Sequence, residues 1–96
     1  MDKKDEDDAF KELVKALSRT DDSELIEDFL RSLLTDNEVY EVSSRWALVK
    51  LIDSGVTQRQ ISRDLGLSLC KITRGSKELK KEDSSFRKML NLINQS

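Results

Sequence analysis

The sequence predicts an all-α protein with six helices, and three observations support this. Apolar residues recur at the 3.6-residue period of amphipathic helices, while no segment sustains the alternation typical of a strand. The chain has no proline to interrupt a helix. Its only glycines are Gly55, Gly66 and Gly75, so the sharpest changes of direction are expected in that one stretch.

The N-terminal residues predict a disordered acidic arm followed by the first helix. Residues 1–8 are almost all charged and offer little apolar surface to bury, so they are expected to stay disordered. A single helical domain is then predicted over residues 9–96. Its first helix covers about residues 9–19, because apolar side chains recur there at helical spacing. These side chains are Phe10, Leu13, Val14 and Leu17.

Two capping boxes predict where the second and third helices begin. Asp21 with Glu24 can cap the second helix, which has a wide apolar stripe and ends near Leu34. Thr35 with Glu38 repeats the pattern at the start of the third helix.

The third helix reaches about Ser54, where Gly55 can end it, and its second half indicates a homodimer. Residues 46–52 are apolar on nearly all sides, whereas a surface helix of a small monomer shows one apolar stripe. The first two helices are amphipathic and have little apolar surface to spare. A second copy of the chain is therefore the favoured cover, and we expect a homodimer with a shared core.

The stretch 57–79 predicts a helix-turn-helix. A helix over residues 58–65 is followed by Gly66, which can adopt a left-handed conformation, and by a second helix that ends near residue 79. The expected caps are Thr57 and Ser68. The side chains expected to pack the two helices together are Ile61, Leu65, Leu67 and Ile72, with Ser62 small enough for a close approach.

A sixth helix then begins after Asp83 or Ser84, either of which can serve as its N-cap. Its apolar side chains keep the helical period. They are Phe86, Met89, Leu90 and Ile93.

Charge is distributed unevenly and favours DNA as the partner of this helix-turn-helix. The whole chain has a net charge of −2, yet residues 45–81 hold nine basic and three acidic residues. In such units the first helix crosses the phosphate backbone and the second enters the major groove of double-stranded DNA. The candidate DNA-binding residues are Gln58, Arg59, Ser62, Arg63, Ser68, Leu69, Cys70, Lys71 and Thr73.

Composition argues against several other classes of protein. With one cysteine, no histidine and no glycine-rich phosphate loop, neither a metal site nor an enzyme is expected. No apolar run approaches the roughly 20 residues needed to span a bilayer, so no membrane association is expected. The acidic N-terminus is unlike a signal peptide, and we expect a cytoplasmic protein.

Four sequence features, in this order, resemble the bacterial tryptophan repressor family. They are Leu33-Leu34-Thr35, Arg45, Gln58-Arg59 and Ile72-Thr73-Arg74-Gly75-Ser76. The similarity extends from Phe10 to about Ile93. It implies a six-helix, intertwined homodimer that represses tryptophan-biosynthesis genes at an operator when L-tryptophan is bound as corepressor.

The resemblance also implies a corepressor site. In the family the indole lies between two arginines that align with Arg45 and Arg74, the second of which also meets the carboxylate. Guanidinium groups suit both tasks, since they stack on aromatic rings and pair with carboxylates. Gly75 would let its helix approach the ligand ring. The resemblance implies that the backbone carbonyl of Ser32, of Leu34 or of both receives the α-ammonium, with Thr35 close by.

One aligned position departs from the family, and two other functions stay open. Glu78 stands where better-known members have a serine that helps hold the ammonium, and this carboxylate could pair with the ammonium or with Arg74 instead. Arg45 could simply pair with Glu41, and Arg74 could contact phosphate. The alternatives are a ligand-independent helix-turn-helix DNA-binding protein and a helical protein–protein adaptor.

Overall fold

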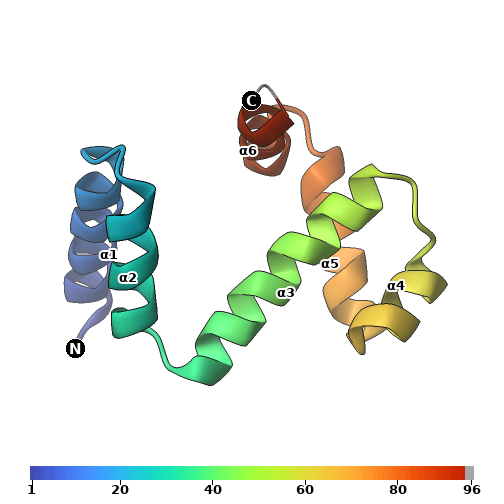
Figure 1. The fold of residues 1–96 in the computed structure, drawn as a ribbon, viewed down its shortest axis with the longest axis horizontal. Helices are drawn as coiled ribbons and strands as arrows, with labels where there is room; N and C mark the ends of the chain where they lie inside the picture. Colours follow the sequence, from blue (N-terminus) through green and yellow to red (C-terminus); the bar gives the residue numbers. More distant parts are fainter. Residues whose placement is uncertain (95–96) are drawn as a thin grey trace. The chain divides into compact units, whose positions relative to one another are not determined.

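The computed structural model describes residues 1–94, and within them it has six helices and no strand, as the sequence predicts (Figure 1). The chain forms two compact units, Met1–Val39 and a second that starts at Tyr40. The helices are α1 (Lys3–Ser18), α2 (Ser23–Leu33), α3 (Asp36–Asp53), α4 (Gln58–Leu65), α5 (Leu69–Lys80) and α6 (Ser85–Asn94). Helix α3 begins in the first unit and continues into the second.

The first helix begins at Lys3, so the predicted disordered arm over residues 1–8 is wrong for most of its length. Asp2 acts as the N-cap, and its carboxylate accepts a hydrogen bond from the Asp5 amide at 2.8 Å. The acids of the first turn also favour the helix, because negative charge is stabilised near the positive end of the helix dipole. The composition of residues 1–8 shows the missing apolar surface but does not show these local interactions.

Side-chain caps begin the next two helices. Asp22, rather than the predicted Asp21, caps α2 by accepting from the amides of Glu24 and Leu25 at 3.1 and 3.2 Å. The capping box of α3 is confirmed. The Thr35 amide donates to Glu38 Oε1 at 2.8 Å, and the Glu38 amide donates to Thr35 Oγ1 at 3.1 Å.

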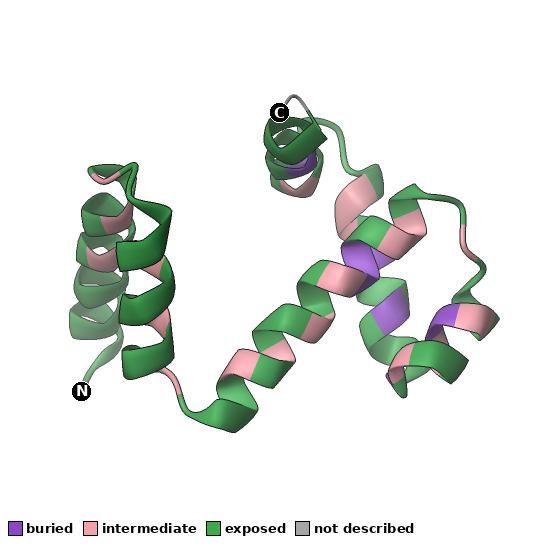
Figure 2. Ribbon diagram, viewed as in Figure 1, coloured by how far each residue is buried: buried purple, intermediate pink, exposed green. Residues whose placement is uncertain are grey.

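The N-terminal unit has amphipathic helices but no buried residue (Figure 2). In α2 the exposed apolar residues Leu25, Phe29 and Leu33 recur every four positions and so share one face. Phe10 and Val14 are likewise exposed on α1. This unit therefore leaves its apolar faces largely open to solvent.

The second unit has a core of its own, and it lies where the helix-turn-helix pattern predicts it. Leu48, Ile61, Leu67 and Ile72 form one buried cluster, in which Ile61 and Ile72 are 0 % exposed. Leu65 packs against this cluster as a partly buried residue. The apolar side chains of α3, α4 and α5 thus hold the helix-turn-helix against α3.

The turn between α4 and α5 follows the predicted chemistry. Gly66 ends α4 with a φ of 65°, a left-handed conformation that strains other residues. The Ser62 hydroxyl donates to the carbonyl oxygen of Leu67 at 3.0 Å, which closes the turn from inside. Ser68 then caps α5 by accepting from the Lys71 amide at 3.4 Å.

Helix α6 is capped by Ser84, one of the two predicted candidates, whose hydroxyl oxygen accepts from the Arg87 amide at 3.2 Å. Asp83 instead adopts a left-handed φ of 59° and makes the turn into the helix. Leu90, 2 % exposed, anchors α6 in the unit. None of the described helices is long and apolar enough to cross a membrane.

Candidate functional site

The outer surface of α4 and α5 presents most of the predicted DNA-binding residues to solvent. Leu69 is 60 % exposed near the start of α5. Ser62 is the exception, because it is half-buried and its hydroxyl is used in the turn. The other exposed candidates are Gln58, Arg59, Arg63, Ser68, Cys70, Lys71 and Thr73.

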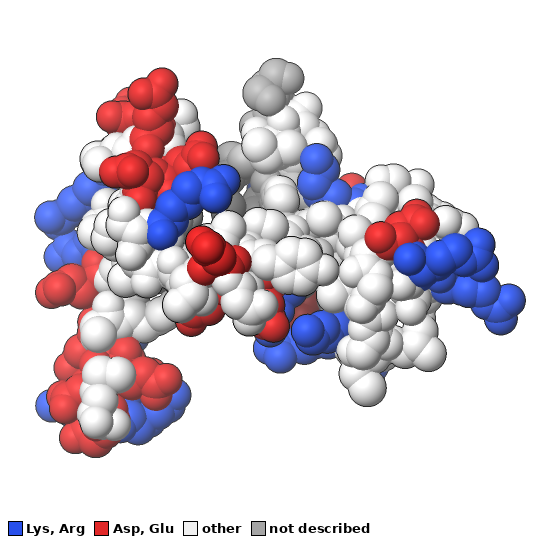
Figure 3. All heavy atoms as spheres, turned by 60° about the horizontal axis from the view of Figure 1, so that its bottom comes forward, with Lys and Arg blue, Asp and Glu red and all other residues white. Residues whose placement is uncertain are grey.

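This surface is rich in cations, which suits a phosphate backbone. Arg59 and Arg63 project from α4, and basic side chains are visible at that end of the unit in the space-filling view (Figure 3). Lys77 and Lys80 continue the series to the C-terminal end of α5. Of the lysines on α5 and just after it, Lys81 is paired with an acid, at 2.9 Å from Glu78.

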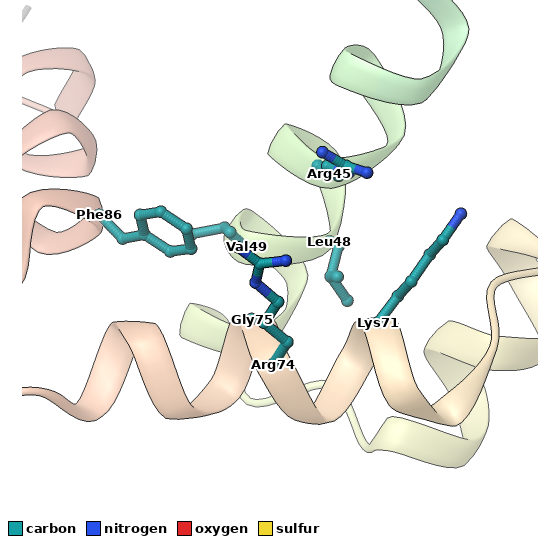
Figure 4. A pocket seen from close by; sticks show the side chains of 7 residues that line it. All are labelled: Arg45, Leu48, Val49, Lys71, Arg74, Gly75 and Phe86. Carbon is teal, nitrogen blue, oxygen red and sulfur yellow. The ribbon is translucent and has the colours of Figure 1, made fainter. Parts of the chain in front are cut away.

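A hollow of about 170 Å³ lies on the side of α5 that faces α3 (Figure 4). Three elements surround it, and they contribute apolar and cationic side chains. The lining residues are Arg45, Leu48 and Val49 from α3, Lys71, Arg74 and Gly75 from α5, and Phe86 from α6. The predicted ligand residues Arg45, Arg74 and Gly75 are therefore brought together.

The charge of the hollow suits an anion. Its lining includes three cations and no acidic residue. Arg45 makes a loose ion pair with Glu41 at 3.7 Å, whereas Arg74 and Lys71 form none within residues 1–94. Two guanidiniums and an ammonium beside an apolar floor can hold a carboxylate and an aromatic ring at once.

Gly75 lines the hollow and also lies close to α3. A Cβ at this position would lie 3.2 Å from Leu48 Cδ2 and 3.5 Å from Ile52 Cδ1, both on α3. The missing side chain therefore makes room for the neighbouring helix α3, and the predicted role of Gly75 toward a ligand stays a prediction. That close approach brings the side chains of Arg45 and Arg74 to the same hollow.

The remaining predicted ligand residues do not line the hollow. Glu78 pairs with Lys81 at 2.9 Å and lines a separate groove along α5, which Arg74 also lines. Ser32, Leu34 and Thr35 belong to the N-terminal unit, where the Thr35 side chain takes part in the capping box of α3. Their role in ligand binding stays a prediction.

Sequence reasoning missed Leu48, Val49 and Phe86 as lining residues and assigned Lys71 to DNA alone. Helical spacing contains part of this information. Arg45, Leu48 and Val49 are related by i, i+3 and i+4, as are Lys71, Arg74 and Gly75, so each trio lies on one helix face. Phe86 gave no such signal, because only the packing of α6 brings it to the hollow.

Together these features define a class of protein: a helix-turn-helix DNA-binding regulator with a hollow beside the second helix of the motif. The family model of the Trp repressor protein matches residues 8–94, so the chain belongs to this family of transcription regulators. It is a trp repressor-type regulator. In residues 1–94 there is no cluster of three or more side chains suited to bind a metal ion.

Individual relatives agree with the family. A Trp operon repressor homolog of Chlamydia caviae is 33 % identical over 86 % of this chain and 83 % of its own length. One from Xylella fastidiosa (strain M23) is 31 % identical over 85 % of this chain and 88 % of its own. A Trp operon repressor homolog of Chlamydia trachomatis serovar L2 is 29 % identical over 92 % of this chain and 95 % of its own length. No solved structure gives a significant match.

Proposed function

We propose that the protein is a tryptophan-dependent repressor, in which L-tryptophan binds the hollow as corepressor and operator DNA binds the outer surface of α4 and α5. The observation that carries this proposal is the position of the hollow. One of its walls is α5 itself, through Lys71, Arg74 and Gly75. A ligand in the hollow therefore contacts the helix that reads DNA.

The hollow fits the chemistry of the proposed ligand. A cavity of roughly 150 Å³ accepts a benzene-sized ring, and this one measures about 170 Å³ and is open to solvent. The indole ring would lie on Leu48 and Val49 between the two guanidiniums, and the carboxylate would pair with Arg74. For the α-ammonium we retain, as implied by the family resemblance alone, the backbone carbonyls of Ser32, Leu34 or both, together with Thr35 and Glu78.

The active form is proposed to be an intertwined homodimer that acts in the cytoplasm on genes of tryptophan biosynthesis. The open apolar faces of α1 and α2 support a second copy as their cover. In helix-turn-helix dimers, tryptophan repressors among them, the two reading helices enter successive major grooves about 34 Å apart. The bound ligand would bias α5 toward the orientation that this spacing requires.

The decisive experiment is a DNA-binding titration with and without L-tryptophan. A mobility-shift assay with a palindromic operator and a scrambled duplex should show operator affinity rising when L-tryptophan is added. By thermodynamic linkage, operator DNA must tighten tryptophan binding by the same factor. An operator affinity that is the same with and without tryptophan would support a ligand-independent DNA-binding protein. Binding to neither duplex at low salt would support a protein–protein adaptor.

Arg45→Gln tests the ligand site without altering the reading helix, because Arg45 lies on α3 and is exposed. Losing one guanidinium from the indole site should weaken tryptophan binding about 5-fold, since a cation–π contact contributes of the order of 1 kcal/mol. Calorimetric titration of the variant measures this. Lys50→Gln, also exposed on α3 but outside the lining, is the matched control and should bind normally.

Arg59→Ala tests which kind of DNA contact α4 makes. If Arg59 donates hydrogen bonds to a guanine, the loss of binding free energy should be about 1–3 kcal/mol for the operator and much smaller for random DNA. Competition binding with both duplexes at one salt concentration gives the answer. Equal losses on both duplexes would reassign Arg59 to the phosphate backbone.

A further inference from the structure

Helix α6 contributes an aromatic side chain to a hollow that otherwise belongs to α3 and α5. Phe86 is half-buried, lines the hollow and reaches toward it from α6 (Figure 4). It lies in the first turn of α6, directly before Arg87. The phenyl ring is the only aromatic group among the lining residues of the described chain.

An ion pair next to Phe86 connects α6 to α3. Arg87 Nη2 lies 2.7 Å from Asp53 Oδ1, and Asp53 is the last residue of α3. The two side chains are 45 % and 26 % exposed, so the pair is partly shielded from solvent. Because α3 also carries Arg45, Leu48 and Val49, this contact joins both sides of the hollow.

The start of α6 is restrained at two further points. Ser84, 7 % exposed, accepts a hydrogen bond from the Arg87 amide, and Leu90 is buried one turn later. Cap, ion pair and buried leucine together fix the direction in which Phe86 projects. A ring held in this way has little rotamer freedom left to lose when a ligand arrives.

We propose that α6 is part of the ligand site: Phe86 forms its third wall and selects aromatic ligands, and the Asp53–Arg87 ion pair holds that wall in place. This inference rests on the proposed function, since it assigns a role to α6 in the same hollow. Phe86 contacts the ligand, where edge-to-face or offset stacking favours an aromatic ring over an aliphatic chain of similar size. Asp53 and Arg87 are positioning residues that act through Phe86.

The test is calorimetric titration of L-tryptophan, and of L-leucine as the aliphatic probe, into the full-length protein and its variants. Phe86→Ala should weaken tryptophan binding about 10-fold, the equivalent of one lost aromatic contact. Phe86→Leu fills the same space without a ring and should narrow the preference for tryptophan over leucine. Thermal unfolding without ligand shows whether each variant is folded.

The ion pair is tested with Asp53→Asn and Arg87→Gln. Each should weaken tryptophan binding about 3-fold, as expected for a partly exposed ion pair. The double variant should lose no more than either single one, because both remove the same contact. Arg87→Lys retains the charge and should recover most of the affinity. Lys88→Gln is the matched control: Lys88 follows Arg87 on α6, and its 2.7 Å ion pair is with Asp83, in the turn before α6, and not with α3.

The possible results separate this inference from the proposed function. If the wild-type protein binds tryptophan and the Phe86 and Arg87 variants bind it equally well, α6 is no part of the site and the inference is overturned. A loss with Lys88→Gln as large as with Arg87→Gln would also overturn it, because α6 would then matter only for general stability. If the wild-type protein binds no tryptophan, the proposed function fails and the inference fails with it.

Discussion

The two units of the chain differ in how completely they bury their apolar side chains. From Tyr40 onward, α3, α4 and α5 bury Leu48, Ile61 and Ile72 against one another within a single chain. Over Met1–Val39 no residue is buried, and Phe10 remains 64 % exposed. Both units have amphipathic helices, so amphipathicity alone does not decide whether a core forms within the chain.

The difference lies in the number of helices available to cover each apolar face. Helix α5 contacts α4, α6 and α3, so its apolar and small residues are covered from several sides. Helices α1 and α2 leave Leu25 and Leu33 more than half exposed. The C-terminal unit therefore has a core within the chain, while the N-terminal unit leaves apolar side chains exposed, and the proposed homodimer would bury them.

Phe29→Glu in α2 should have the largest effect, and that effect is on the stability of the proposed dimer. If a second copy covers the face formed by Leu25, Phe29 and Leu33, the variant buries an unpaired charge and destabilises the dimer by about 3–5 kcal/mol. Analytical ultracentrifugation over a range of concentrations measures the change. Glu27→Gln, which removes the 2.9 Å ion pair with Arg31 on the opposite face of α2, should leave dimerisation nearly unchanged. A Phe29→Glu protein that dimerises like the wild type would show that this face is not the interface.

Ile72→Ala tests the independent core of the C-terminal unit. Ile72 is 0 % exposed, so the cavity left by its truncation should lower the free energy of unfolding by about 3 kcal/mol. Urea denaturation followed by circular dichroism provides the measurement. Leu69→Ala, three residues earlier on the same helix and 60 % exposed, should change stability by less than about 0.5 kcal/mol. Similar losses for both variants would show that Leu69 is buried in the assembled protein.

The smallest expected effect is at the junction of the units, where Glu38 caps α3. Hydrogen bonds from the backbone and the side chain of Thr35 lower the pKa of Glu38 from its ordinary 4.5. The ionised Glu38 cap therefore contributes its full stabilisation at pH values above the ordinary pKa of 4.5. This stabilisation is lost as the pH falls through the lowered pKa of the folded protein. Amide exchange at the start of α3 should rise in acid, and Glu38→Gln should remove this pH dependence. Glu24→Gln in α2 serves as the control, because α2 is capped by Asp22.

Much of the fold could be predicted from the sequence because its helices begin at strong local signals. The boundaries of α4 agree with the prediction, and Thr35, Ser68 and Gly66 act as expected. Local signals were also the source of the errors. Asp2 provides a cap that the composition of residues 1–8 concealed, and Asp22 caps α2 in place of its neighbour.

The candidate site was predicted only in part because it depends on how helices pack. Arg45, Arg74 and Gly75 came from a family pattern, and the structure places them together. The role of Phe86 requires the orientation of α6, which is set by Ser84 and by an ion pair to a residue 34 positions earlier in the chain. No local pattern in the sequence contains that contact.

The close approach at Gly75 defines a point about which α5 could tilt relative to α3. The helix contacts α3 at this point, where a Cβ would stand 3.2 Å from Leu48. Leu69, the first residue of α5, lies six residues before Gly75, which is about 9 Å of helical rise. A tilt of α5 about this contact would displace the end of the helix that presents Leu69 sideways. Because Gly75 also lines the hollow, a molecule bound there would lie next to the point of contact between α5 and α3.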